Sequence, residues 1–551
     1  MYAKEYLELR IKDALSELGL SWPDKAVVEP PREKHFGDLA CNVAMLLAKQ
    51  AGQQPRELAS RIKTVLENRS DQLESIEVAG PGFLNFFFKN AFWQQIILTI
   101  NKELESFGAS HLGQNRRVLI EYVSANPTGP LHIGHGRGAA LGDSLARIMR
   151  FAGFDVQTEY YVNDAGQQMQ TLGESVWIRY QRWCGIEVSL APNHYQGDYL
   201  EDIARDLWEN HACALLDEPW ERAVSICRDK AVQIILEGIR EDLAAFGIEH
   251  QSWFSERRLL ESSEIQDTLD WLQKQDLAYT QDSALWFRST AFGDDKDRVL
   301  QKSDGSWTYF ASDICYHQNK YQRGFETLVN IWGADHHGYA PRIKAAVQAL
   351  GATEGSLQMI LVQLVNLLRG GCQVSMSTRA GEFVTLREVL EEVGVDACRF
   401  IFLSRKSDSH LDFDLEEVKK KSMDNPVFYV QYAHARICSV FAKAGEKNLE
   451  IDKPLEQLLT FLSTHEDLDL LKQLENFPDV VQAAAKNLSP HLISFYLKDL
   501  ASLLHRYYTE HSVLGAESVD LVQARLLLLR TVSLVLKNGL KLLGVHAPEK
   551  M

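Results

Sequence analysis

Two histidines three positions apart lie in a turn rich in proline and glycine, and their spacing suits chemistry on a phosphate. His132 and His135 belong to residues 124–137, which read S-A-N-P-T-G-P-L-H-I-G-H-G-R. Residues 118–120 before the turn are apolar and predict a buried strand, whereas residues 139–148 after it have helical spacing. Because the first N–H groups of a helix are free and its dipole is positive there, the pattern predicts a phosphate site at this helix start.

Three glycines accompany the two histidines. Gly134, Gly136 and Gly138 have no Cβ, so the backbone can approach an anion closely. Two other interpretations compete with a phosphate site, namely a chance match in a polar turn and half of a metal site. No cysteine or carboxylate cluster nearby in the sequence completes a ligand set for a metal.

The segment resembles the H-I-G-H signature of class I aminoacyl-tRNA synthetases, and S-A-N-P-T-G-P-L-H-I-G-H resembles its version in the arginyl-tRNA synthetase family. The length of this match, more than its four central letters, favours the phosphate site. The resemblance implies that the histidines and the glycine hold ATP and stabilise its α-phosphate during adenylation. The residues it assigns to ATP here are His132, Gly134, His135, Gly136, Gly333, His336 and His337.

His336 and His337 also suggest a metal site. They lie in residues 332–339, W-G-A-D-H-H-G-Y, after the apolar run 328–333 that predicts a strand. Adjacent side chains point in different directions, so two neighbouring histidines seldom bind one ion. In the family that the chain resembles, this turn lines the adenine and ribose side of the ATP site, and we adopt that interpretation.

Recognition of arginine requires carboxylates, because guanidinium is a planar fork of donors that keeps its charge. The resemblance implies that Glu256 and Asp313 clamp the guanidinium, that Tyr309 packs on it or bonds to it, and that Asp335 orients it. Tyr309 and Asp313 are four residues apart and would share one face of a helix. Ser124 and Asn126 would hold the α-amino and carboxylate groups of arginine.

A second signature is degenerate. Residues 373–381, Q-V-S-M-S-T-R-A-G, stand where this class carries K-M-S-K, and Ser375 and Thr378 replace its lysines. Those lysines stabilise the pyrophosphate as it leaves, and losing one such donor costs roughly 10²–10³ in rate. Arg379, Arg137, bound Mg²⁺ or a tRNA-driven rearrangement could compensate, and the sequence does not choose among them. The resemblance assigns ATP contacts to Met376, Ser377, Thr378 and Arg379.

The elements around these motifs predict three domains. Residues 113–395 alternate apolar runs with helical patterns, which favours an α/β fold with a Rossmann-like, doubly wound parallel sheet. A helix-rich stretch at about 165–250 should be an insertion between the two halves of that fold. An N-terminal α+β domain is expected over 1–110, a connecting segment over 396–424, and an all-α helical bundle over 425–551.

The outer domains resemble the parts of arginyl-tRNA synthetases that bind tRNA. The N-terminal one would touch the corner of the tRNA, and the helical one would bind the anticodon. The residues expected at these surfaces are Asn42 and Phe83 in the first and Tyr429, Tyr432 and Arg436 in the second. Without the resemblance, the two would be a packed domain of unknown role and a plain helical bundle.

Bulk properties set limits on function class. The 551 residues have 45% hydrophobic content and a net charge of −17, which by itself mildly favours a small-molecule enzyme over a nucleic-acid-binding protein. No apolar run is long enough to span a membrane, and the first residues do not resemble a signal peptide. Eight scattered cysteines without a C-x-x-C pair predict reduced thiols in a cytoplasmic protein.

We therefore predict an arginine–tRNA ligase that uses ATP, L-arginine and tRNA(Arg), with Mg²⁺ bound to ATP and no dedicated metal site in the protein. We expect a monomer, which is the family default, with no DNA or membrane partner. Two alternatives are a catalytically impaired RNA-binding relative, which the degenerate second signature suggests, and a small-molecule nucleotidyl transferase of the same superfamily. The apparent tRNA domains argue against the transferase, and the intact first signature argues against the impaired relative.

Overall fold

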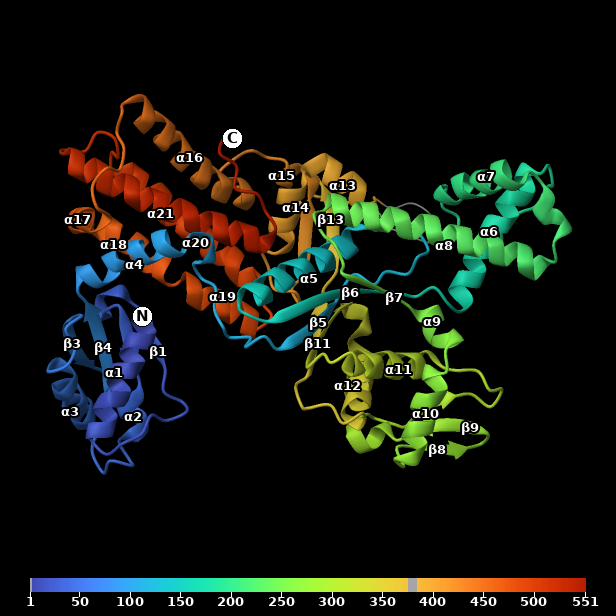
Figure 1. The fold of residues 1–551 in the computed structure, drawn as a ribbon, viewed down its shortest axis with the longest axis horizontal. Helices are drawn as coiled ribbons and strands as arrows, with labels where there is room; N and C mark the ends of the chain where they lie inside the picture. Colours follow the sequence, from blue (N-terminus) through green and yellow to red (C-terminus); the bar gives the residue numbers. More distant parts are fainter. Residues whose placement is uncertain (1, 375–383) are drawn as a thin grey trace.

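The computed structural model describes residues 2–374 and 384–551. The molecule is elongated, with the N-terminal unit at one end, a parallel sheet near the centre and the helices of residues 167–245 at the other end (Figure 1). The ATP contacts predicted at Met376, Ser377, Thr378 and Arg379 lie outside the described residues.

The N-terminal unit is a small α+β structure. Helices α1 (Ala3–Glu17), α2 (Val43–Leu47) and α3 (Pro55–Glu67) accompany a four-stranded antiparallel sheet. Its order is β1 (Val28–Glu29), β2 (Leu39–Cys41), β4 (Phe83–Phe88) and β3 (Leu73–Ala79). Phe86 and Phe88 of β4 are buried in the core of this unit. Helix α4 (Asn90–Glu103) then leads to the central sheet.

The central sheet has five parallel strands. Its order is β12 (Leu357–Val362), β11 (Thr327–Gly333), β5 (Arg117–Glu121), β6 (Asp155–Val162) and β7 (Ser252–Ser255). The chain builds outward from β5 in one direction and from β11 in the other, so the strand order reverses between these two strands. In doubly wound sheets, ligands bind at the carboxyl ends of the strands that flank this reversal. The predicted fold class is confirmed.

The helical insertion has a different place from the one expected. Helices α6 (Gln167–Trp183), α7 (Tyr199–His211) and α8 (Trp220–Ala245) connect the neighbouring strands β6 and β7, within the first half of the sheet. The segment between the two halves holds α9 (Glu256–Glu261), α10 (Glu264–Lys274), the small sheet β10-β9-β8 and α11 (Tyr309–Gln322). Strand β7 is only four residues long, which explains why the sequence pattern hid it.

One cysteine pair contradicts the expectation that all eight thiols are reduced. Cys184 and Cys213 form a disulfide with their Cα atoms 5.7 Å apart. Cys184 follows α6 and Cys213 follows α7, and the packing of these two helices brings the cysteines together across 29 residues. The sequence pattern missed this pair because the adjacency arises from helix packing rather than from local spacing.

The rest of the chain is mostly helical. Helix α12 (Ala340–Ala349) joins β11 to β12, and a small sheet has the order β14 (Cys372–Gln373), β13 (Val365–Arg369) and β15 (Leu411–Asp414). Helices α13 (Leu386–Val393), α14 (Val395–Phe402) and α15 (Leu415–Val418) precede a helical unit. That unit comprises α16 (Pro426–Glu446), α17 (Leu455–Leu458), α18 (His465–Glu475), α19 (Phe477–Lys486), α20 (His491–Glu510) and α21 (Val519–Leu543). Within the described residues, no helix is both long and apolar enough to cross a bilayer.

A buried arginine ties the helical unit to the central sheet. Arg399 of α14 donates to the carbonyl of Leu543 at 2.8 Å and to that of Phe246 at 3.2 Å, and it forms an ion pair with Asp143. Ser144 also donates to the Leu543 carbonyl, at 3.2 Å. Asp143 and Ser144 belong to α5 (Ile133–Phe151), the helix that begins at the two histidines. The end of α21 therefore rests directly on that helix.

Candidate active site

A cavity of about 680 Å³ lies at the carboxyl ends of β5 and β11, at the reversal of strand order. Its walls come from the turn after β5, the first turn of α5, the turn after β11 and the side of α11. Among the predicted residues, its lining includes Ser124, Asn126, His132, Gly134, His135, Asp313, Gly333, Asp335 and His336. Residues more than 200 positions apart in the sequence thus meet in one cavity, which the topology rule for doubly wound sheets anticipates.

The two histidines cap the start of α5. The Gly134 N–H donates to Nδ1 of His132 at 3.1 Å, and the His132 N–H donates to Nδ1 of His135 at 3.3 Å. The two rings stack with their centroids 3.7 Å apart. Since both Nδ1 atoms accept hydrogen bonds, each neutral ring carries its proton on Nε2.

Both rings are neutral at pH 7. Burial lowers the pKa of His132, and burial together with the neighbouring His132 lowers the pKa of His135 to about 3. The pair therefore offers two Nε2–H donors beside the positive end of the α5 dipole without adding a formal charge. This arrangement suits an oxygen whose negative charge grows during a reaction.

The three glycines at the start of α5 have different surroundings. A Cβ on Gly134 would lie 3.0 Å from the His132 ring, whereas Gly138 has open space and lines the cavity. A Cβ on Gly136 would lie 2.7 Å from Leu386 of α13. Gly136 is buried and therefore serves the packing of α5 on α13 in the structure, instead of facing the cavity as predicted.

Three acids near Tyr161, namely Glu121, Glu256 and Asp313, form what we call the acidic wall of the site. Glu121 at the end of β5 is buried, and Asp313 of α11 accepts a hydrogen bond from Tyr339. Burial raises the pKa of Asp313 to about 7, and the charges of Glu256 and Glu121 also raise it. Burial likewise raises the pKa of Tyr161, and the charges of Glu256, Asp313 and Glu121 raise it further. A cation entering here would relieve the repulsion among these acids.

Of these three acids, Glu256 is not among the residues that line the cavity. Its side chain is buried, its Oε2 has no hydrogen-bond partner, and burial raises the pKa of its carboxyl group. It sits at the start of α9, directly after β7. A buried acceptor without a partner is costly, and a donor from a bound ligand would satisfy it.

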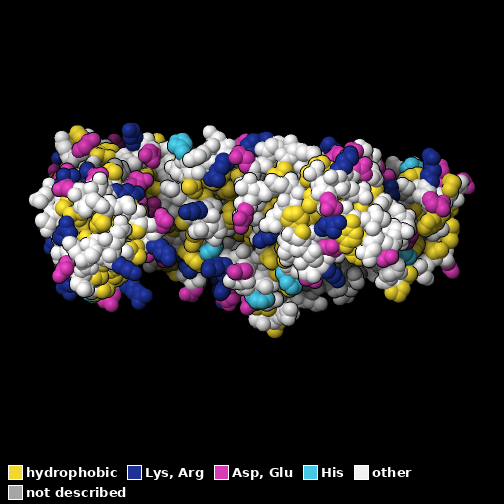
Figure 2. Space-filling view, turned by 90° about the horizontal axis from the view of Figure 1, so that it is seen from below, with side chains coloured by type: hydrophobic (Ala, Val, Ile, Leu, Met, Phe, Trp, Pro, Cys, Tyr) yellow, Lys and Arg dark blue, Asp and Glu magenta, His cyan; other side chains and the backbone are white. Residues whose placement is uncertain are grey.

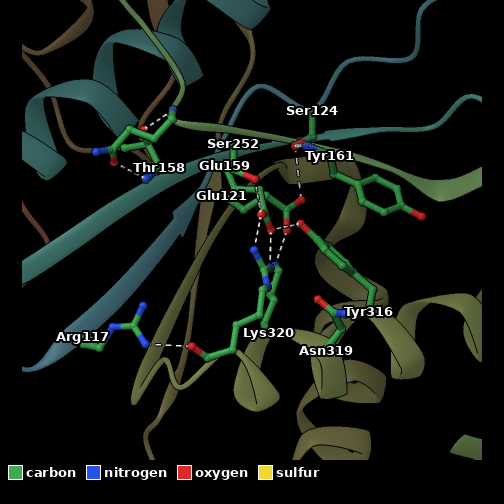
Figure 3. A network of polar contacts seen from close by, with 12 residues as sticks. Arg117, Glu121, Ser124, Thr158, Glu159, Tyr161, Ser252, Tyr316, Asn319 and Lys320 are labelled. Carbon is green, nitrogen blue, oxygen red and sulfur yellow. Dashed lines mark hydrogen bonds and ion pairs between the residues drawn. The ribbon is translucent and has the colours of Figure 1, made fainter. Parts of the chain in front are cut away.

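A polar network holds the acidic wall in place (Figure 3). Lys320 of α11 has a fully buried side chain, forms an ion pair with Glu121 and donates to Asn330 of β11 at 3.1 Å. Beside it, Glu159 of β6 accepts two hydrogen bonds from Arg323, at 2.6 and 2.8 Å, and one from Tyr316 at 2.8 Å. The network therefore fixes α11 against β5, β6 and β11, and Asp313 lies on that helix.

Several predicted residues lie at the edge of the site. Asp335 and His336 are exposed and 3.6 Å apart, and His337 turns back to the Ala334 carbonyl at 3.2 Å. Tyr309 is 61% exposed at the first position of α11, one turn before Asp313. Asn126 donates to Gln168 of α6 at 2.8 Å. Asn126, Asp335 and His336 line the cavity, whereas Tyr309 and His337 are not among its lining residues.

The sequence analysis missed residues that the fold brings to the site. Glu121 is the last residue of β5, and its place at a strand end could have indicated it. Lys320 and Tyr339 gave no signal, because their roles depend on long-range contacts with Glu121 and Asp313. Arg137, a candidate to replace the missing lysines, is buried and donates to the carbonyls of Gln363, Ser409 and Lys406 at 2.8–2.9 Å. In the structure, the Arg137 guanidinium therefore binds the backbone of residues 363 and 406–409.

The residues predicted to contact tRNA have different surroundings in the structure. Tyr429 and Tyr432 of α16 pack against His505 of α20, and Arg436 lies over the Tyr508 ring at 4.3 Å. Phe83 is exposed at the start of β4. Asn42 binds the backbone of residues 25–27 through its amide, at 3.0 and 3.3 Å.

The surface charge is also compatible with a nucleic-acid partner. Figure 2 shows Lys and Arg side chains interspersed with Asp and Glu across one face of the molecule. The net charge of −17 therefore does not make this face uniformly acidic.

A parallel sheet followed by a helix that begins at paired histidines is typical of class I aminoacyl-tRNA synthetases. In agreement, the family model of the class I (R) tRNA synthetase catalytic domain matches residues 97–185 and 212–437. The arginyl-tRNA synthetase N-terminal domain matches residues 5–88, and the DALR anticodon-binding domain matches residues 430–551. The chain belongs to the arginyl-tRNA synthetase family.

Individual relatives agree with this assignment. The chain is 55% identical over 552 aligned residues, covering all of both chains, to the arginine–tRNA ligases of Oleidesulfovibrio alaskensis and Nitratidesulfovibrio vulgaris. A solved structure of an arginyl-tRNA synthetase from Campylobacter jejuni matches 84% of this chain and 100% of its own, with 37% identity and a TM-score of 0.76.

Proposed function

We propose that the protein attaches L-arginine to its cognate tRNA in two steps. Arginine and ATP first form arginyl-adenylate and pyrophosphate, and the arginyl group then passes to the 3′-terminal ribose of the tRNA. The observation that carries this proposal is that the acidic residues around Asp313 and the paired histidines line one cavity, in a chain that matches its family over its whole length.

The acidic wall would bind the guanidinium group. Asp313 lines the cavity, and Glu256 holds an unpartnered buried oxygen behind it. A guanidinium offers a fork of donors and retains its charge when buried, so it pairs well with two carboxylates. Tyr309 and Asp335 would close over the ligand from the rim, and Ser124 and Asn126 would meet its α-amino and carboxylate groups.

The histidine wall would bind ATP. The α-phosphate would face the Nε2–H groups of His132 and His135, with Gly134 and Gly138 allowing its close approach, and Gly333 and His336 would line the nucleoside. A carboxylate oxygen of arginine attacks the α-phosphorus in line, the bond to the bridging oxygen breaks, and pyrophosphate leaves. Because the attacking carboxylate is already ionised, no protein base is required, and catalysis rests on positioning and charge stabilisation.

Mg²⁺ would enter with the nucleotide, as the MgATP substrate. Within the part of the chain that the structure describes, no group of three or more His, Cys, Asp or Glu side chains could hold a metal ion. We propose that Met376, Ser377, Thr378 and Arg379, which lie outside the described residues, contact ATP. With Arg137 committed elsewhere, Arg379, Mg²⁺ or tRNA-driven closure would supply the missing stabilisation.

The outer units would hold the tRNA. The helical unit, through the surface of Tyr429, Tyr432 and Arg436, would bind the anticodon, and the N-terminal unit around Asn42 and Phe83 would reach the corner of the tRNA. We further propose that the protein acts as a monomer in the cytoplasm.

One assay separates this function from its alternatives. ATP–pyrophosphate exchange should depend on arginine, should not respond to lysine, and should respond to tRNA. A catalytically impaired relative would show no exchange under any condition, and a small-molecule nucleotidyl transferase would exchange without arginine or tRNA.

A further inference from the structure

The turn that carries the first signature is held from outside by three different elements. The Tyr160 hydroxyl of β6 donates to the Ala125 carbonyl at 2.8 Å, and the Leu386 N–H of α13 donates to the Leu131 carbonyl at 2.7 Å. Between them, the Tyr199 hydroxyl of α7 donates to the Thr128 carbonyl. The three held carbonyls are three residues apart, so they fix the turn at its start, middle and end.

Within the middle of this turn, the Thr128 N–H donates a backbone hydrogen bond to the Asn126 carbonyl at 2.7 Å. Pro127 and Pro130 have no N–H to donate, and Gly129 places no restraint on its backbone. The side chain of Tyr199 packs closely against this part of the turn. A Cβ on Gly129 would lie 3.0 Å from the Tyr199 hydroxyl, and a Cβ on Gly197 would lie 2.3 Å from the Tyr199 ring. The ring therefore fits closely between these two glycines.

The helical insertion also contacts helix α13. Asp242 of α8 accepts a hydrogen bond from Arg387 of α13 at 2.8 Å, and α13 begins just after residues 375–383. Figure 1 shows α8 running from the outer end of the insertion toward α13. Tyr199, Asp242 and Arg387 line one cavity of about 440 Å³ between the insertion and the signature turn. The insertion thus contacts both the signature turn and α13.

We propose that Tyr199 is a positioning residue for adenylation. Its hydrogen bond to Thr128 sets the path of the turn into the N-cap at His132, and so aims the Nε2–H groups of His132 and His135 at the α-phosphate. Tyr199 lies in residues 186–211, which the family model of the catalytic domain leaves unmatched and which the Cys184–Cys213 disulfide brackets. This inference rests on the proposed function.

The test removes only the hydroxyl. In arginine-dependent ATP–pyrophosphate exchange with tRNA present, Tyr199→Phe should lower kcat about tenfold and leave the KM for arginine within about twofold, because misplaced groups cost rate more than ground-state binding. Gly197→Ala, which would push the ring aside, should lower kcat in the same way. Thermal unfolding midpoints should stay close to that of the unaltered protein in both variants.

A matched control lies in the same insertion. The Tyr180 hydroxyl donates to the Ala212 carbonyl at 2.6 Å and does not contact the signature turn. Tyr180→Phe should therefore keep its kcat. An unchanged kcat in Tyr199→Phe, a loss of arginine affinity alone, or an equal loss in Tyr180→Phe would overturn the proposal. Failure of the proposed function itself would look different, because the unaltered protein would then show no arginine-dependent exchange.

Discussion

The charge of Asp313 should control how the use of arginine responds to pH. Burial raises the pKa of this carboxyl group to about 7, the hydrogen bond from Tyr339 partly opposes that shift, and the nearby Glu256 adds to it. Guanidinium stays protonated at every accessible pH. Only the protein partner of the pair therefore changes its charge near neutrality, and arginine needs the ionised form of Asp313.

The size and sign of the effect follow from that pKa. With a pKa of about 7, roughly nine-tenths of Asp313 is ionised at about pH 8 and roughly one-tenth at about pH 6. Because the loss occurs as pH falls through the raised pKa, kcat/KM for arginine should fall about tenfold over this range, equivalent to about 1.4 kcal/mol. His132 and His135 remain neutral here because burial lowers their pKa values.

The assay is arginine-dependent ATP–pyrophosphate exchange at saturating ATP with tRNA present, followed across this pH range. Asp313→Asn should lower kcat/KM for arginine by a factor equivalent to about 2–4 kcal/mol of transition-state free energy. It should also flatten the pH profile of kcat/KM, since no titrating carboxylate remains at that position. The kcat/KM for ATP serves as the control and should change little. A wild-type profile without the fall, or the same fall in Asp313→Asn, would refute this reasoning.

Three further predictions concern the rest of the site. His132→Ala and His135→Ala should each lower kcat for adenylation about 10²–10³-fold with little change in the KM for arginine, and a loss confined to arginine affinity would show that the motif has another role. Arg399→Met should lower the free energy of unfolding by about 2–4 kcal/mol in chemical denaturation, because it leaves Asp143 with Arg147 alone and removes the donor to the buried Leu543 and Phe246 carbonyls, and a change below about 1 kcal/mol would contradict this role of Arg399. Arginine-dependent exchange should be very slow without tRNA, since Ser375 and Thr378 replace the lysines that stabilise the leaving pyrophosphate and binding energy from tRNA must compensate. Thr378→Lys should partly relieve this dependence, and rapid exchange in enzyme freed of tRNA would count against the prediction.

Local pattern predicted much of the fold. The apolar runs at 118–120 and 328–333 are strands β5 and β11, and the glycine-rich turn between strand and helix is the start of α5. Their adjacency follows from the topology of parallel sheets, so the meeting of His132 with Asp313 in one cavity could be foreseen. The short strand β7 could not, because four residues with partial burial carry no clear period.

What the sequence could not show depends on contacts between distant residues. Lys320 is a buried cation only because Glu121 lies across from it, and Arg137 is unavailable to ATP only because it binds a loop near residue 406. The Cys184–Cys213 pair and the Tyr199 hydrogen bond both depend on how α6 and α7 fold back. Periodicity describes one element at a time and contains no information about such pairings.

The central claim is that this protein joins arginine to tRNA because its acidic wall selects a guanidinium cation. The most direct measurement is ATP-dependent charging of tRNA with arginine, compared with citrulline, in which a neutral urea replaces the guanidinium. The account predicts efficient charging with arginine and a kcat/KM for citrulline lower by about 10³-fold or more, since buried acids would be left without a charged partner. Absence of charging with arginine, or comparable charging with both amino acids, would contradict it.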